Sequence, residues 1–121
     1  MAKILVVDDS ATQLQSLTKS LQKHGHEIIT AADGIEAVET ATNELPDIIL
    51  MDGVMPNLNG FQATRQITKG SKTAHIPVIM LSGKDQETDK VWAARQGAKG
   101  YCIKPPDEKE LLKTISDLLA G

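Results

Sequence analysis

The chain has 121 residues, a formal net charge of −3 at pH 7 and 24% charged residues. This length suits one domain with a real hydrophobic core, and the composition is that of ordinary soluble globular proteins. The negative charge argues against nucleic acid or an anionic membrane surface as a partner. The lone cysteine, Cys102, can form no internal disulfide, and no apolar run approaches the roughly 20 residues of a membrane span. We therefore expect a cytoplasmic protein, with residues 1–121 as one domain and no membrane insertion.

Five short apolar runs predict β-strands along the chain. Turn-forming or charged residues bound each run, and the first run starts too near Met1 to leave room for a signal peptide. The predicted strands are residues 3–8, 27–31, 47–52, 77–81 and 101–104.

Segments with helical periodicity separate these runs. Several helices begin with a capping-box pattern, in which a hydroxyl or acidic residue precedes Gln or Glu by three positions. The pairs are Ser10 with Gln13, Asp33 with Glu36, and Asp107 with Glu110. A fourth helix is expected over residues 85–96, with Gly97 as its stop. The last helix is expected to bury Leu111, Leu112, Ile115, Leu118 and Leu119.

Strands that alternate with helices favour an α/β fold, a five-stranded parallel sheet that is doubly wound as (βα)5. Sites in such open sheets lie at the carboxyl ends of the strands. This rule brings together the polar residues that follow or close four of the runs. They are Asp8 and Asp9, Asp52, Ser82 and Lys104.

Carboxylates gathered at one sheet edge need a cation. Two of them repel by roughly 4 kcal/mol at 4 Å and an effective dielectric constant near 20. Oxygen ligands suit Mg²⁺, and zinc is disfavoured because no His or Cys converges on the cluster. A Mg²⁺ site beside a carboxylate, a lysine and a hydroxyl suits phosphoryl transfer to form an aspartyl phosphate.

The motifs at the strand ends resemble those of one family over essentially the whole chain. They are Val7-Asp8-Asp9-Ser10, Leu50-Met51-Asp52-Gly53-Val54-Met55-Pro56, Asn59-Gly60, Leu81-Ser82-Gly83 and Lys104-Pro105. In this order and spacing they resemble the receiver domain of two-component response regulators. The resemblance implies a CheY-like domain with the flavodoxin-like strand order 2-1-3-4-5.

The resemblance also implies roles for the site residues. Asp52 would be the phosphoacceptor. The Mg²⁺ ligands, direct or through water, would be Asp8, Asp9, Asp52 and the backbone carbonyl of Val54.

Three further positions match the family's switch residues. Lys104 would pair with the phosphoryl group, and the hydroxyl of Ser82 would move toward it. Tyr101 would rotate between buried and exposed states as that hydroxyl shifts. The bond between Lys104 and Pro105 is expected to be cis.

Two further segments are similar to the single-domain regulators of twitching-motility chemosensory systems, the PilH type. They are Phe61-Gln62-Ala63-Thr64-Arg65-Gln66 and Lys84-Asp85-Gln86-Glu87-Thr88-Asp89-Lys90-Val91-Trp92. Both lie outside the shared catalytic set, so they bear on the pathway.

The favoured interpretation is a phosphorylation-controlled switch without an output domain. A histidine kinase would donate the phosphoryl group to Asp52, and helix 4, strand 5 and helix 5 would bind an unknown downstream protein. The chain would be a monomer or a weak phosphorylation-dependent dimer. It would not be an enzyme, apart from catalysing its own phosphotransfer and autodephosphorylation. A phosphate sink for the kinase, and a phosphorylation-independent adaptor of the same fold, stay open.

Other interpretations of these residues are weaker. A flavodoxin-like electron carrier needs a hydroxyl- and glycine-rich loop where Asp8 and Asp9 stand. A haloacid-dehalogenase-type phosphatase usually has a second aspartate where Val54 stands. Asp8 or Asp9 alone could simply cap a helix, and Tyr101 could simply be packed.

Overall fold

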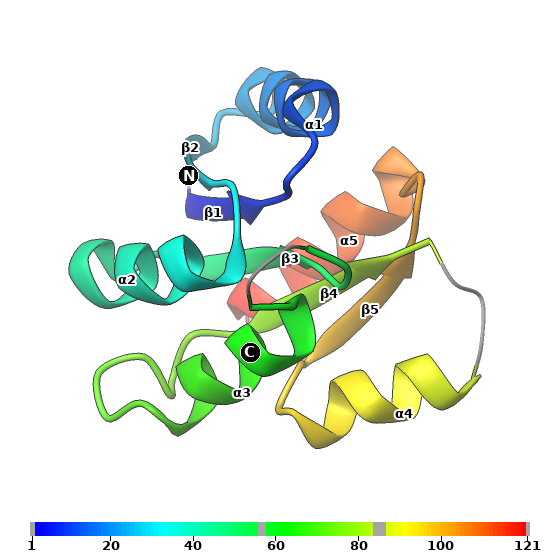
Figure 1. Cartoon of the computed structure of the whole chain (residues 1–121). Helices are drawn as coiled ribbons and strands as arrows, with labels where there is room; N and C mark the ends of the chain where they lie inside the picture. Colours follow the sequence, from blue (N-terminus) through cyan, green and yellow to red (C-terminus); the bar gives the residue numbers. More distant parts are fainter. Residues whose placement is uncertain (1, 56–57, 84–86, 121) are drawn as a thin grey trace.

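The computed structural model describes residues 2–55, 58–83 and 87–120, and the side chains of the last range from residue 90 onward. Strands and helices alternate along this part of the chain (Figure 1). The strands are β1 (Lys3–Val7), β2 (Glu27–Ala31), β3 (Ile48–Asp52), β4 (Val78–Ser82) and β5 (Gly100–Ile103). The helices are α1 (Ala11–Lys23), α2 (Gly34–Glu44), α3 (Gly60–Lys69), α4 (Glu87–Arg95) and α5 (Glu108–Ala120).

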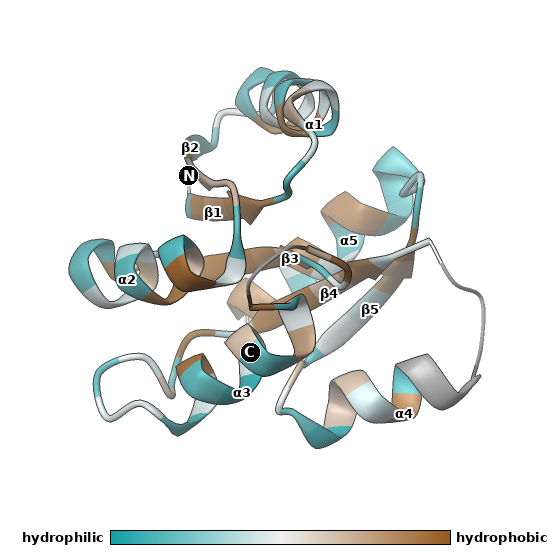
Figure 2. Cartoon of the chain, in the orientation of Figure 1, coloured by the Kyte–Doolittle hydropathy of each residue, from teal (hydrophilic) through white to brown (hydrophobic). Residues whose placement is uncertain are grey.

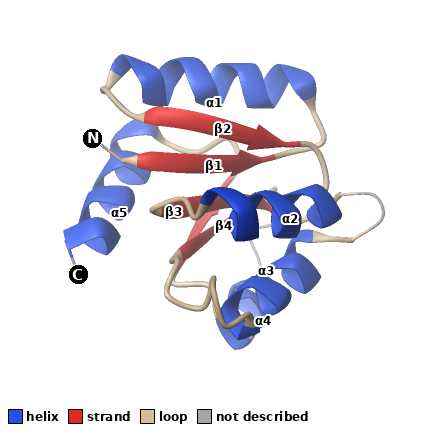
Figure 3. Ribbon diagram, turned by 90° about the vertical axis from the view of Figure 1, so that its left-hand side faces the viewer, coloured by secondary structure: helices blue, strands red, loops and turns tan. Residues whose placement is uncertain are grey.

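The strands form one parallel sheet in the order β2-β1-β3-β4-β5, which confirms the predicted doubly wound α/β fold. Figure 3 shows β2, β1, β3 and β4 in succession. Helices α1 and α5 cover one face of the sheet, and α2, α3 and α4 cover the other (Figure 1). Every helix in the described ranges is too short or too polar to cross a bilayer.

The core follows from the two-residue period of the strands. On β1, Ile4 and Val6 face the α1–α5 layer, whereas Leu5 and Val7 face the α2–α3–α4 layer. The central strand β3 is buried on both faces, which explains its unbroken apolar sequence before Asp52. Figure 2 shows this contrast between apolar strands and helices with polar outer faces. Each buried aliphatic side chain contributes about 2 kcal/mol of transfer free energy.

The predicted starts of α2 and α5 are confirmed, because in each the capping side chain accepts a hydrogen bond from the backbone N–H three residues later. The backbone N–H of Glu36 donates to Asp33 Oδ1 over 2.8 Å, and that of Glu110 donates to Asp107 Oδ2 over 3.1 Å. A complete capping box, in which both residues bond reciprocally, occurs at α3 between Asn59 and Gln62. That box was not predicted.

Two helix predictions need correction at their ends. Helix α4 ends at Arg95, one residue before the predicted end, and Gly97 follows with a φ of 103° that suits a glycine stop. The predicted start at Asp85 lies outside the described residues. The prediction that Leu119 is buried is wrong, because it is 39% exposed. The helical period places Leu119 about 80° from Leu111, off the face that packs on the sheet.

Candidate functional site

Four strands deliver polar side chains to the same edge of the sheet. Asp52 and Ser82 are the last residues of β3 and β4, while Asp8 and Lys104 directly follow β1 and β5. Because β1, β3, β4 and β5 are successive neighbours and parallel, these positions converge. Asp8, Asp52 and Ser82 are buried, at 1%, 6% and 2% exposure. The structure therefore brings together the residues that the sequence grouped.

Lys104 bridges two of the carboxylates. Its Nζ lies 2.7 Å from Asp8 Oδ2 and 3.1 Å from Asp52 Oδ1. Burial alone would lower the pKa of Lys104, but the hydrogen bonds to Asp8 and Asp52 outweigh that effect and raise the pKa above its usual value. The ammonium group therefore stays charged between the two acids.

The three acidic side chains form a compact cluster. Asp8, Asp9 and Asp52 each place a carboxylate oxygen within 4.8 Å of the others. Burial raises the pKa of Asp52, and the charge of Asp8 adds to this effect, while the hydrogen bond from Lys104 opposes it. One ammonium group leaves three carboxylates under-neutralised. The all-oxygen donor set fits a hard divalent cation such as Mg²⁺.

The backbone around Asp52 is closely packed. A Cβ atom on Gly60 would lie 1.9 Å from the carbonyl oxygen of Asp52, so only glycine fits at the start of α3. The backbone N–H of Gly60 donates to the Gly53 carbonyl over 3.2 Å. The N–H of Val54 donates to Asp52 Oδ1 over 3.3 Å, which holds the carboxylate against the β3–α3 loop. These contacts fix the position of Asp52.

Ser82 and Tyr101 lie on the two strands beyond β3. The backbone N–H of Lys104 donates to the Ser82 carbonyl over 2.8 Å, which ties the ends of β4 and β5 together. Tyr101 pairs with Met80 in the sheet register, is half-buried and packs against the core of the α2–α3–α4 layer. The peptide bond between Lys104 and Pro105 is cis.

Gln13 is a site residue that the sequence interpretation missed. Lys104 Nζ, just after β5, donates to Gln13 Oε1 in the first turn of α1 over 2.6 Å. The Ser10 hydroxyl does accept from the Gln13 backbone N–H, as the capping pattern predicted. The reciprocal half of that box is absent, because the backbone N–H of Ser10 donates to Asp8 Oδ1 over 2.8 Å instead. The Ser-x-x-Gln pattern marked the helix start but could not show where the glutamine side chain points.

The chain is similar in sequence to a known family and to two characterised relatives. Residues 4–116 match the family model of the response regulator receiver domain. The chain is 59% identical over 121 residues to protein PilH of Pseudomonas aeruginosa, with 100% of both chains covered. It is also 37% identical to the transcriptional regulatory protein PhoP of alkaline phosphatase synthesis in Bacillus subtilis, where 97% of this chain matches 48% of the relative.

Solved structures share the fold at similar coverage. The Vibrio cholerae chemotaxis protein CheY4 matches with a TM-score of 0.91 and 36% identity over 98% of both chains. The receiver domain of a P. aeruginosa sensor histidine kinase matches with a TM-score of 0.92 and 29% identity, over 99% of this chain and 98% of the other. That receiver domain has a magnesium ion coordinated in its active-site cleft.

Proposed function

This chain belongs to the response regulator receiver domain family, and from that premise we propose that Asp52 is its phosphoacceptor. The observation that carries the proposal is the position of Lys104, which bonds both Asp8 and Asp52 at the carboxyl edge of the sheet. Asp52 is the central carboxylate of this edge because β3 is the central strand. A histidine kinase is the phosphodonor that membership of this family implies.

The transfer itself requires few groups. A carboxylate oxygen of Asp52 forms a bond to phosphorus as the bond between phosphorus and the imidazole nitrogen of the phosphohistidine breaks. The leaving nitrogen keeps the electron pair of that bond. Lys104 offers its charge to the phosphoryl oxygens, and the hydroxyl of Ser82 offers a hydrogen bond. Val54 N–H and the β3–α3 loop keep the nucleophile oriented.

Mg²⁺ fits this site because three carboxylates face a single ammonium group and offer only oxygen donors. Asp8, Asp9 and Asp52 would hold it, and the backbone carbonyl of Val54 would add a fourth oxygen. When bound, the ion neutralises negative charge on the carboxylates and on the phosphoryl group. A bound cation would oppose the effect of burial and of Asp8, which raise the pKa of Asp52, and would favour its ionised form.

Phosphorylation would switch a surface made by α4, β5 and α5. Ser82 precedes the β4–α4 connection, and its carbonyl already bonds the backbone of Lys104 at the end of β5. A phosphoryl group that draws the Ser82 hydroxyl inward would leave room for Tyr101 to turn. Exposed apolar residues on these elements, Val91, Ile103 and Leu119, would then bind a partner protein.

The pathway proposed for this switch is type IV pilus-based twitching motility. The full-length identity of 59% to PilH supports it. Restoring twitching to a strain that lacks the gene should require the wild-type chain and should fail with Asp52→Ala. Equal rescue by both forms would favour the phosphorylation-independent adaptor.

Phosphorylation is tested by intact mass after incubation with acetyl phosphate and Mg²⁺. We expect wild type to gain one phosphoryl group, Asp52→Ala to gain none, and a chelator to abolish the gain. Asp117→Ala is the matched control, because it removes an exposed aspartate of α5 and should be phosphorylated like wild type. A phosphoryl group that persists on Asp52→Ala would assign the acceptor to another residue.

A further inference from the structure

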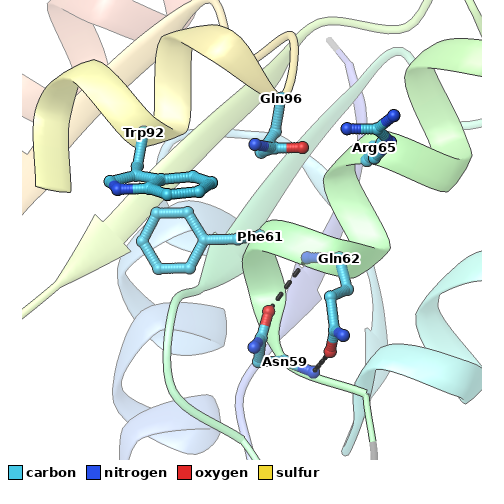
Figure 4. Close-up of a pocket in the computed structure, with 6 residues that line it drawn as sticks. All are labelled: Asn59, Phe61, Gln62, Arg65, Trp92 and Gln96. Atoms are coloured by element: carbon cyan, nitrogen blue, oxygen red, sulfur yellow. Dashed lines mark hydrogen bonds between the residues drawn. The ribbon is translucent and has the colours of Figure 1, made fainter.

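A groove between α3 and α4 is separate from the carboxyl-edge site. Its volume is about 430 Å³, within the usual range of ligand pockets. Figure 4 shows the aromatic rings of Phe61 and Trp92 lying against each other across the two helices. Trp92 is 55% exposed, which is unusual for the only tryptophan of a chain. The groove is lined by Asn59, Phe61, Gln62, Arg65, Trp92 and Gln96.

Gln96 is a buried polar side chain that faces this groove. It is 8% exposed, and its side-chain amide makes no hydrogen bond with any residue in the described ranges. Its backbone carbonyl accepts from Thr68 Oγ1 over 2.8 Å, which fixes its position against α3. Figure 4 shows the amide directed toward the same space as Arg65. The amide N and O of Gln96 are not among the buried polar atoms that lack a partner in the described residues, so they reach the solvent in the groove and can bond a ligand there.

Asn59 and Gln62 form a rigid rim on the α3 side. Each side-chain oxygen accepts from the backbone N–H of the other residue, over 3.2 and 2.9 Å (Figure 4). The cap therefore uses their side-chain oxygens, while each NH2 group keeps its two donors. The other recognition groups of the groove are an aromatic pair, the amide of Gln96 and the guanidinium of Arg65.

The charges around the groove indicate which kind of ligand it would bind. Residues 53–106 carry eight Lys and Arg against three acidic residues, whereas the rest of the chain carries five against thirteen. The groove lining includes Arg65 and no carboxylate. Within the described part of the chain, Arg65 forms no salt bridge. An acidic group would therefore complement the groove, whose lining holds Arg65 and no carboxylate.

The groove also touches the phosphoacceptor strand. The ring of Phe61 lies 3.4 Å from the position that a Cβ atom on Gly53 would take, directly after Asp52. Trp92 belongs to α4, the helix that follows β4 and Ser82. A change at Asp52 thus has a short mechanical route to the ring of Phe61, which lies against that of Trp92 (Figure 4).

We propose that the groove between α3 and α4 is a docking site for an acidic segment of a partner protein. An aliphatic side chain of the segment packs on Phe61 and Trp92. A carboxylate pairs with Arg65, and a backbone group of the segment bonds the amide of Gln96. This surface lies on the α3 side of α4 and is additional to the α4–β5–α5 surface proposed above.

Three matched synthetic peptides test the proposal. The first carries two leucines flanked by glutamates, the second replaces the glutamates with lysines, and the third replaces the leucines with serines. Binding is measured by Trp92 emission and by calorimetry. We expect the first peptide to bind at least about tenfold more tightly than either of the others, and more weakly as salt is added.

Charge reversal locates the binding. Arg65→Glu should weaken binding of the acidic peptide about fivefold or more and strengthen binding of the lysine peptide. Lys113→Glu makes the same charge change on α5, across the sheet, and should leave the ratio between the peptides as in wild type.

Several outcomes overturn the proposal. One is equal effects of Arg65→Glu and Lys113→Glu, and another is equal binding of the serine peptide. A third is the absence of binding by the acidic peptide at millimolar concentration. A concentration-dependent dimer in sedimentation that Arg65→Glu dissociates would instead make a second copy of the chain the occupant.

Discussion

Helices α4 and α5 follow the last two strands of the sheet in the same way, yet they are held to the sheet very differently. Helix α5 buries Leu111 and Ile115 in the core with α1. In helix α4, Ala93 is the buried side chain among those that the structure describes, while Val91 and Trp92 are exposed. The stability of the fold therefore rests far more on α5. An element with few buried contacts is the one that a modification can displace at low free-energy cost.

The largest expected effect is the loss of the α5 contact. Ile115→Ala should lower the free energy of unfolding by about 3 kcal/mol, because it leaves a cavity at a 1% exposed position. Urea unfolding of this variant and of Leu119→Ala measures the contrast. Leu119 is 39% exposed on the same helix, and its truncation should cost about 0.5 kcal/mol or less. Equal losses would contradict the assignment of α5 as the anchored helix.

The end of α4 provides the next largest effect. Gly97→Ala should destabilise the fold by about 2 kcal/mol, since residue 97 has a φ of 103° and an added Cβ would lie 2.7 Å from Thr68. Gly83→Ala is the control, because a Cβ there meets nothing within 4 Å. Thermal unfolding should separate the two variants clearly. If both variants unfold at the same temperature as wild type, the close contact between Thr68 of α3 and residue 97 does not contribute to the stability of the fold.

At the carboxyl edge of the sheet, a substitution should stabilise the fold rather than destabilise it. Asp52→Asn should modestly raise the free energy of unfolding at pH 7 without Mg²⁺, because burial and the charge of Asp8 raise the pKa of Asp52. The ionised form costs stability above the raised folded-state pKa. As the pH falls through that pKa toward the usual value of 3.8, Asp52 protonates and the cost disappears.

The difference in the free energy of unfolding between Asp52→Asn and wild type should therefore be largest at neutral pH and should disappear on acidification. Chemical unfolding across this pH window measures it, with Asp117→Asn as the exposed control. If wild type is instead more stable than Asp52→Asn at neutral pH and loses this advantage on acidification, the ionised carboxylate stabilises the fold and folding lowers the pKa of Asp52.

The smallest effect is expected on the exposed face of α4. Trp92→Ala should change the free energy of unfolding by about 0.5 kcal/mol, because the side chain is 55% exposed. Circular dichroism must follow unfolding, since the variant lacks the only tryptophan. A loss of more than about 2 kcal/mol in the free energy of unfolding would show that Trp92 packs as a core residue, and α4 would then be held to the sheet as firmly as α5.

The same contrast explains what the sequence could predict. The leucines and isoleucine of α5 have a helical period and a capping pair, so its start and its two buried residues, Leu111 and Ile115, were predicted correctly, whereas Leu112 and Leu118 are only partly buried. Helix α4 has no comparable apolar stripe, and the signal named for it in the sequence was Gly97 as its stop. The fold followed from short-range patterns repeated along the whole chain.

The site was predictable to the extent that it depends on strand ends. The rule for parallel sheets placed Asp8, Asp52, Ser82 and Lys104 together without knowledge of any side-chain direction. The bond between Lys104 and Gln13 joins residues 91 positions apart and depends on side-chain rotamers. The groove between α3 and α4 depends on the distance between two helices. Sequence patterns carry no information on either quantity.

The central claim is that charge placed at Asp52 displaces the weakly held helix α4. The most direct test is Trp92 emission on addition of beryllofluoride, a stand-in for the phosphoryl group, with Mg²⁺ present. The account predicts a saturable change in wild type and none in Asp52→Ala. No change in wild type, when beryllofluoride binding at Asp52 is verified independently, would contradict the account, and so would an equal change in both proteins.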